Sequence, residues 1–213
     1  FNTRFTRQML IDTQPKDFNT LVRLSGFSHG TDVWLGNARE LIVSGTASVL
    51  ETVGCRDDIM LYLISKGLDA KMSFKIMEAV RKGKVKKGGF DEGWEDAMRE
   101  HEVPEWYIES LAKIGYLFPK AHAVAYVMMA FRIAYFKINY PEAYYASYFS
   151  VRACDDFDYS CMCQGIDVAR DAIREIQAKG QEATAKDKNK QTVLEIVVEF
   201  YARGFKFCPI DLY

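Results

Sequence analysis

The interval between Glu109 and Glu142 contains no acidic residue, although the chain has 29 Asp and Glu residues in total. The interval holds four basic residues: Lys113, Lys120, Arg132 and Lys137. Within it, Phe118-Pro-Lys-Ala-His-Ala places Lys120 and His122 in the first turn of a predicted long helix. Backbone N–H groups and the helix dipole attract anions at such a start, and a lysine there suits a phosphate. The pattern indicates a phosphate site, although a solvated Lys120 and a half-buried, hydrogen-bonded His122 also account for it.

A second polar group lies in Ser25-Gly-Phe-Ser-His-Gly-Thr-Asp, which we expect to form a loop because its two glycines permit tight turns. Ser28, His29 and Asp32 are the residue types of a nucleophilic triad, but triad members converge from separate elements. We therefore expect Ser28 and His29 to hydrogen-bond a ligand, with ordinary turn chemistry as the alternative.

A third candidate is Arg56, which directly precedes Asp57 and Asp58 at a predicted helix start. The planar guanidinium fork can bind a phosphate through two parallel hydrogen bonds. A local ion pair with Asp57 or Asp58 is the competing interpretation.

Catalytic carboxylates are the next requirement, because phosphoryl transfer commonly uses two metal ions held by paired acids. The adjacent Asp pairs are Asp57–Asp58 and Asp155–Asp156. Consecutive residues on a helix point about 100° apart, so Asp57 and Asp58 cannot readily share one metal. Neither a glycine-rich Walker loop nor H-E-x-x-H occurs. We therefore expect phosphate binding with no catalytic residue, no metal site and no cofactor bound by this stretch.

The cysteines do not form a recognisable framework. There are five: Cys55, Cys154, Cys161, Cys163 and Cys208. An odd number without C-x2-C spacing favours free thiols over disulfides or zinc. A metal at Cys154, Cys161 and Cys163 is the alternative.

Composition limits the classes of protein that these residues could serve. The chain has 213 residues, 28 Lys and Arg against 29 Asp and Glu, and a net charge of −1. This balance excludes a generally basic nucleic-acid coat but allows a local basic patch. The sequence does not begin with Met and shows no signal peptide, so we expect a cytoplasmic piece of something larger. The longest apolar stretch, 121–140, carries Arg132 and Lys137, so we expect a buried helix and no membrane span.

The elements that position these residues are predicted to be helices. Apolar residues recur at helical spacing, which predicts a mainly α fold of many helices, with one ending before Ser25 and a long one over 119–139. Glycine- and lysine-rich residues 83–93 and polar residues 181–191 are expected to be mobile loops. Phe205-Lys-Phe-Cys alternates and predicts a short strand near the C-terminus.

Several of these motifs, taken together and in order, resemble the PolC-type replicative DNA polymerases, the Gram-positive form of the alpha subunit of bacterial DNA polymerase III. The resemblance is carried by residues 25–37 (SGFSHGTDVWLGN), 54–60 (GCRDDIM), 103–110 (VPEWYIES), 118–126 (FPKAHAVAY) and, less specifically, 203–213. It runs nearly end to end. Phe27, where leucine is more usual, is a modest departure.

The resemblance implies the multi-helix fingers domain of a bacterial family C DNA polymerase. It divides the chain into the end of the palm and its connection (1–16), the helical fingers (17–203), and a strand that begins the following region (204–213). The parent protein is then a DNA-directed DNA polymerase, a nucleotidyltransferase of DNA replication. Its catalytic aspartates and Mg²⁺ belong to the palm, outside these residues, so the fragment alone should be inactive. The implied partners are the incoming deoxynucleoside triphosphate (dNTP), primer–template DNA, the palm and other domains, and replisome components.

The resemblance and the residue patterns together assign the candidate sites. Nucleotide-binding residues are expected to be Ser28, His29, Arg56, Lys120, His122 and Tyr126. Tyr126 lies four residues after His122, on the same helix face, where it could stack on a ligand or pack in the core. DNA-binding residues are expected to be Lys113, Arg132 and Lys137. The alternative function is a helical interaction module that docks other polymerase domains or a replication partner.

Overall fold

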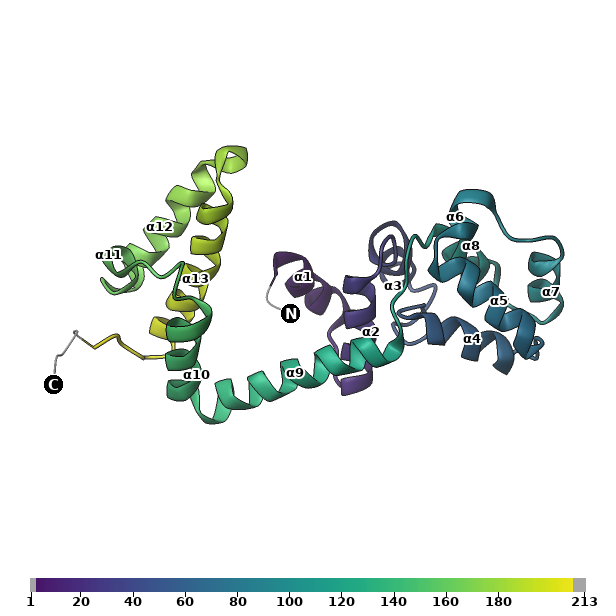
Figure 1. Ribbon diagram of the computed structural model, residues 1–213, viewed down its shortest axis with the longest axis horizontal. Coiled ribbons are helices and arrows are strands. Elements are labelled where there is room, and N and C mark those ends of the chain that lie inside the picture. The colour runs from purple at the N-terminus through teal and green to yellow at the C-terminus, as the bar shows by residue number, and fades with distance from the viewer. Residues whose placement is uncertain (1–2, 209–213) are drawn as a thin grey trace. The chain divides into compact units, whose positions relative to one another are not determined.

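The computed structural model describes residues 3–208, and the chain divides into two compact units, residues 1–132 and 133–213. The predicted mainly α fold is confirmed (Figure 1). Over residues 3–208 the only strand-like pairing is a single antiparallel bridge between Thr31 and Tyr116. The boundary between the units falls inside helix α9 (Lys120–Asn139).

The first unit contains α1 (Arg4–Thr13), α2 (Phe18–His29), the π-helical turn η1 (Trp34–Ala38), α3 (Arg39–Val43), α4 (Arg56–Ser65), α5 (Ala70–Arg81), α6 (Lys84–Gly88), α7 (Trp94–Glu100), α8 (Glu105–Lys113) and the start of α9. The second contains the end of α9, α10 (Pro141–Ser147), the π-helical turn η2 (Tyr148–Arg152), α11 (Tyr159–Met162), α12 (Ile166–Ala178), the 3-10 turn η3 (Gly180–Glu182) and α13 (Ala185–Ala202).

Helix α2 extends to His29, so the prediction that it ends before Ser25 is wrong. Ser25, Gly26 and Phe27 are buried within the helix, and Phe27 stacks on Trp34 with ring centroids 5.2 Å apart. Gly26 serves close packing rather than a turn, because a Cβ there would lie 2.2 Å from the carbonyl oxygen of Gly54. Tertiary packing thus overrides the local turn preference of glycine.

Residues 84–88, predicted to be loop, form helix α6. The apolar side chain of Val85 is 3% exposed and belongs to the core of the first unit. Gly83, with φ 66°, lies against Gly115, where a Cβ would meet the Gly115 carbonyl oxygen at 2.4 Å. The glycines therefore bound a packed helical turn.

Helix α9 has the predicted bounds, but the expectation that it is buried is wrong. Ala123 and Val127 are its buried residues, and they pack on Val22 of α2. From Met128 onward large apolar side chains such as Phe136 and Ile138 are exposed. By length and composition alone this helix is long and apolar enough to cross a membrane, which is weak evidence for a span; 11% of its apolar window is buried. The same pattern suits a helix that another part of a larger protein covers.

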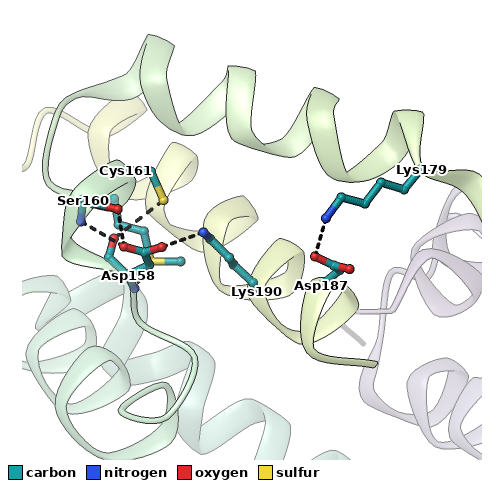
Figure 2. Close-up of polar contacts among 7 residues, drawn as sticks. Asp158, Ser160, Cys161, Lys179, Asp187 and Lys190 are labelled. Carbon is teal, nitrogen blue, oxygen red and sulfur yellow. Dashed lines mark hydrogen bonds and ion pairs between the residues drawn. The ribbon is translucent and has the colours of Figure 1, made fainter. Parts of the chain in front are cut away.

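The second unit is centred on α12 and α13, whose apolar side chains Ala169, Leu194 and Val197 form its core with Met162. Two ion pairs flank it, Lys190–Asp158 at 2.6 Å and Lys179–Asp187 at 2.8 Å (Figure 2).

Residues 185–191, predicted to be loop, form the first turns of α13. Thr184 and Asp187 exchange hydrogen bonds with each other's backbone N–H groups and form a capping box. Such a box stabilises a polar helix start that apolar periodicity does not reveal.

No strand forms over residues 205–208, and residues 209–213 of the predicted C-terminal segment lie outside the described part of the chain. Phe205 and Phe207 both contact Phe200, with ring centroids 5.5 and 4.6 Å away. The alternating apolar and polar residues of 205–208 therefore indicate an extended segment, in which the rings of Phe205 and Phe207 pack on the same side. A β-strand also needs hydrogen bonds to a neighbouring backbone segment.

Candidate functional site

Four rings from separate parts of the first unit form one aromatic cluster: His29, Phe118, His122 and Tyr126. The His29 ring lies 5.2 Å from that of His122 and 5.0 Å from that of Tyr126. Phe118 stacks on His122 at 4.8 Å. Three predicted nucleotide-binding residues thus come together although 93 positions separate His29 from His122.

The packing of α2 on α9 produces this meeting. Val22 of α2 is buried against Ala123 and Val127 of α9, which brings the last turn of α2 to the first turns of α9. His122 and Tyr126, one helical turn apart, then point to the same side. Tyr126 is 55% exposed, which favours the prediction of a pocket side chain over core packing.

Hydrogen bonds orient His29. Its Nδ1 lies 2.7 Å from the carbonyl oxygen of Ser25, which can only accept, so Nδ1 carries a proton. In the neutral ring Nε2 is then the acceptor. The Ser28 hydroxyl donates to the same carbonyl at 2.9 Å and lies 3.3 Å from Nδ1. Ser28 and His29 therefore form one polar group on the last turn of α2, rather than on a loop.

The segment 115–119 is held in place by backbone hydrogen bonds to three elements. Thr31 donates to the Tyr116 carbonyl at 3.0 Å, and Leu117 donates to the Arg81 carbonyl at 3.2 Å. Arg56 donates to the Phe118 carbonyl at 3.1 Å. The Phe118 ring consequently has a fixed place beside the start of α4.

The starts of α4 and α9 adjoin at this point. The Asp57 carboxylate accepts the backbone N–H of Lys120 at 2.7 Å. The expectation that this N–H is free for a phosphate is therefore wrong, because a negative side chain already satisfies the positive end of the helix. An anion held here therefore cannot use the Lys120 N–H and has to be bound by other groups, such as side chains.

The side chains of Arg56 and Lys120 are available for that role. Within residues 3–208 neither forms an ion pair with a carboxylate. The alternative, in which Arg56 pairs with its neighbours, does not occur, because Asp58 pairs with Arg23 at 2.6 Å. Two unpaired cations thus begin two adjoining helices beside the aromatic cluster.

The predicted DNA-binding residues are not gathered with this cluster. Lys113 is exposed at the end of α8, and Arg132 is exposed on α9 with Nη1 4.0 Å from Met129 Sδ. Lys137 belongs to the second unit, where it pairs with Glu199 at 2.8 Å. Their shared role stays a prediction.

Over the described residues no group of three His, Cys, Asp or Glu side chains could hold a metal. All five cysteines are free thiols. Burial raises the pKa of Cys55 to about 12, helped by the nearby Asp58 carboxylate. Burial also raises the pKa of Cys161 and that of Cys163, so these thiols are not activated nucleophiles.

Sequence reasoning missed Phe118 and Asp57 as parts of the site. Phe118 carried a usable signal, since an aromatic residue before Pro119 and a helix start commonly packs against that start. Asp57 carried none, because its partner Lys120 lies 63 positions away.

Comparison with known proteins supports the resemblance. The sequence profile described as "Bacterial DNA polymerase III alpha subunit finger domain" matches residues 1–102. "DNA polymerase III PolC-type" of Caldanaerobacter subterraneus subsp. tengcongensis is 59% identical over 100% of this chain, which covers 15% of that relative. The proteins of the same name from Oceanobacillus iheyensis and Bacillus subtilis are 57% and 55% identical over 100% of the chain, which covers 15% and 14% of them.

The chain therefore spans about 15% of the length of the curated relatives that it matches. The agreement extends through both compact units, whereas the finger profile ends within the first. The chain belongs to the PolC-type DNA polymerase III family, as a fragment that includes finger-domain sequence.

Proposed function

We propose that this chain binds the triphosphate of an incoming dNTP, and helps to hold primer–template DNA, in a protein that carries out template-directed DNA synthesis. The observation that carries the proposal is the placement of Arg56 and Lys120, whose side chains form no ion pair within residues 3–208, beside the cluster of His29, Phe118, His122 and Tyr126. Cations next to three half-buried rings and the exposed ring of Tyr126 suit a ligand that has phosphates and a base.

The side chains divide into two chemical roles. Arg56 and Lys120 neutralise charge on the triphosphate, including the charge that grows on the leaving pyrophosphate. The rings of His29, His122 and Tyr126, with the Ser28 hydroxyl, contact the base or the sugar. Lys113, Arg132 and Lys137 are assigned to DNA phosphates, for which Lys137 would have to leave Glu199.

Metal ions for this chemistry are expected to be held outside this chain. The best-placed acids, Asp57 and Asp58, are engaged by the Lys120 N–H and by Arg23. They do not fit a two-metal site, which needs carboxylates that converge on both ions. Mg²⁺ is therefore assigned to the palm, and this chain supplies binding and charge neutralisation.

Single-nucleotide incorporation by the full-length polymerase tests the proposal. The double variant Arg56→Ala/Lys120→Ala should raise the KM for dNTP and lower kcat, because charge at the triphosphate matters most in the transition state. Lys71→Ala/Lys75→Ala, on the exposed surface of α5, is the matched control and should behave as wild type. Unchanged kinetics of the first variant at subsaturating dNTP would contradict the proposal.

A second function, docking to other polymerase domains or to replisome partners, is favoured by the exposed apolar side chains of α9. Large exposed apolar patches commonly mark interaction surfaces. The two functions can coexist in a cytoplasmic polymerase, since the aromatic cluster uses the first turns of α9 and the exposed apolar residues continue to Ile138. If docking were the sole function, substitutions in the cluster would leave dNTP kinetics unchanged.

A further inference from the structure

We propose that three lysines of the first unit, Lys84, Lys87 and Lys113, form a contact face for the sugar–phosphate backbone of the template strand. This lysine face joins α6 to the end of α8. The proposal deepens the DNA-binding part of the proposed function and rests on it. The sequence pattern alone predicts a mobile loop over residues 83–93, which contains Lys84 and Lys87.

Helix α6 presents its lysines on a packed support. Val85 is buried in the core of the first unit, whereas Lys84 and Lys87 are exposed. Lys84 and Lys87 are three positions apart and therefore neighbours on one helix face. Gly89, with φ 80° and ψ 179°, ends the helix in a conformation that only glycine adopts easily. Gly83, Gly89 and the buried Val85 thus hold this short basic helix in one position.

Local acids do not neutralise this face. Lys86 pairs with Asp32 at 2.7 Å, and Lys82 pairs with Glu78 at 2.8 Å. Across residues 3–208 no carboxylate forms an ion pair with Lys84, Lys87 or Lys113. The two lysines of α6 and Lys113 at the end of α8 are thus exposed cations without an ion-pair partner among the described residues, which favours an extended anion.

Lys113 and α6 share one surface feature. Lys86 and Lys113 line the same open hollow of about 450 Å³, together with Asp32, Leu35, Gly36 and Ala112. The backbone of Gly36 is accessible in this hollow, because a Cβ atom added to Gly36 would have no neighbour within 4 Å. The hollow therefore lets a strand approach between the end of α8 and α6.

Helix α6, which carries Lys84 and Lys87, is connected to the aromatic cluster through a short chain of contacts made by Lys86. Lys86 binds Asp32, and the adjacent Thr31 pairs with Tyr116, two residues before Phe118. A dNTP at the cluster must pair with a template base, so the template backbone has to pass close to the cluster. This proximity favours DNA over an acidic protein segment as the occupant.

The test measures binding of the full-length polymerase to a fluorescently labelled primer–template at 50 and 200 mM salt. The triple variant Lys84→Gln/Lys87→Gln/Lys113→Gln should bind more weakly and with a shallower salt dependence. Each lost phosphate contact lowers the slope of log K against log salt by about 0.7–0.9. Three contacts correspond to roughly a 20- to 40-fold change in affinity over that salt range.

Lys16→Gln/Lys186→Gln/Lys188→Gln removes the same number of exposed lysines elsewhere and should leave the slope unchanged. The triple Arg variant of the lysine face keeps the charge and should retain affinity, which separates charge loss from misfolding. The KM for dNTP at saturating DNA should stay at the wild-type value. A failure of the lysine-face proposal would therefore appear in DNA binding, whereas a failure of the triphosphate assignment would appear in the dNTP kinetics of the Arg56 and Lys120 variants.

The proposal is overturned if the Gln variant keeps the wild-type DNA affinity and slope. It is also overturned if the control variant loses as much, or if only binding to an acidic protein partner declines.

Discussion

The Asp57 carboxylate accepts the backbone N–H of Lys120 at 2.7 Å, so an acidic residue in the first turn of one helix caps the start of another. Arg56, the residue before it, donates its own backbone N–H to the Phe118 carbonyl at 3.1 Å. These two bonds hold the N-terminus of α4 next to the N-terminus of α9. They place two cationic side chains together and put one negative charge between the helix and any incoming phosphate.

Replacing Asp57 separates its structural role from its charge. Asp57→Asn keeps an oxygen that can accept the Lys120 N–H, so stability should change by less than about 1 kcal/mol. Loss of the negative charge beside Arg56 and Lys120 should lower the KM for dNTP several-fold. Asp57→Ala also removes the cap and should cost about 0.5–2 kcal/mol. Steady-state kinetics and urea unfolding followed by tryptophan fluorescence measure both effects; a higher KM in Asp57→Asn would refute the charge argument.

Lys120 tests the triphosphate assignment by itself. A charge-assisted hydrogen bond contributes roughly 1.5–3 kcal/mol, so Lys120→Ala in the intact enzyme should lose about ten- to a hundred-fold in kcat/KM. Lys120→Arg should recover part of this, because its planar fork cannot take the same position as an ammonium group. Both variants should fold normally. If Lys120→Ala incorporates nucleotide at the wild-type rate, Lys120 is a solvated side chain that does not contact the triphosphate.

The close approach of α2 to Gly54 predicts a large effect of one methyl group. Gly26→Ala would put a Cβ 2.2 Å from the Gly54 carbonyl oxygen, and should destabilise the first unit by about 2–4 kcal/mol. Gly88→Ala is the matched control, because a Cβ there meets nothing within 4 Å and α6 gains helix propensity. All three tryptophans (Trp34, Trp94 and Trp106) lie in the first unit, so their fluorescence reports its unfolding alone.

The second unit should lose stability in acid through Asp158. Hydrogen bonds from Lys190 and Ser160 lower the pKa of Asp158 to about 2, against 3.8 for the unperturbed group (Figure 2). A lowered folded-state pKa stabilises the fold fully above the unfolded value, and this contribution is lost as pH falls from about 4 to about 2. Because the side chain is 37% exposed, solvent screening limits the effect to about 1 kcal/mol or less.

Thermal melts followed by circular dichroism between pH 5 and pH 2 measure this effect. Asp158→Asn should show a smaller fall in melting temperature than wild type. Asp171→Asn, which removes a carboxylate paired with Arg174 within α12, is the control and should follow wild type. Identical acid profiles for wild type and Asp158→Asn would contradict the prediction.

The 213-residue chain by itself should not extend a primer. Its best-placed carboxylates are engaged in a helix cap and an ion pair, and two-metal catalysis needs acids free to bind both ions. Primer extension by the purified chain, persisting after contaminating polymerase is removed, would refute this. A mixture with added full-length polymerase is the positive control for the assay.

Much of the fold could be predicted from local pattern. Apolar periodicity and a proline at position 119 predicted the bounds of α9. The acidic residues of the first turn of α4 predicted where α4 begins. Errors occurred where a distant contact decides the local state. Gly26 sits inside a helix because Gly54 packs on it, and 84–88 is helical because Val85 is buried.

The candidate site was predicted in its residue types but not in its arrangement. Residues Ser28, His29, Arg56, Lys120, His122 and Tyr126 stood out by chemistry, motif and helix position. The meeting of His29 with His122 and Tyr126 depends on Val22 packing against Ala123 and Val127, which no spacing reveals. The approach of Arg56 to Lys120 depends on the bond from the Lys120 N–H to Asp57.

The sequence by itself therefore determined a helical chain, its candidate site residues by type, and its membership of a polymerase family, because helix periodicity, side-chain type and motif order are local properties. Tertiary structure decided which charges are free. Asp57 accepts the backbone N–H of Lys120, while Asp58 and Asp32 pair with Arg23 and Lys86. Within residues 3–208 this leaves the side chains of Arg56, Lys120, Lys84, Lys87 and Lys113 without an ion-pair partner. Salt screens a charge beyond about 8–10 Å at physiological ionic strength, so its partner is set by distance in space and not by separation along the chain.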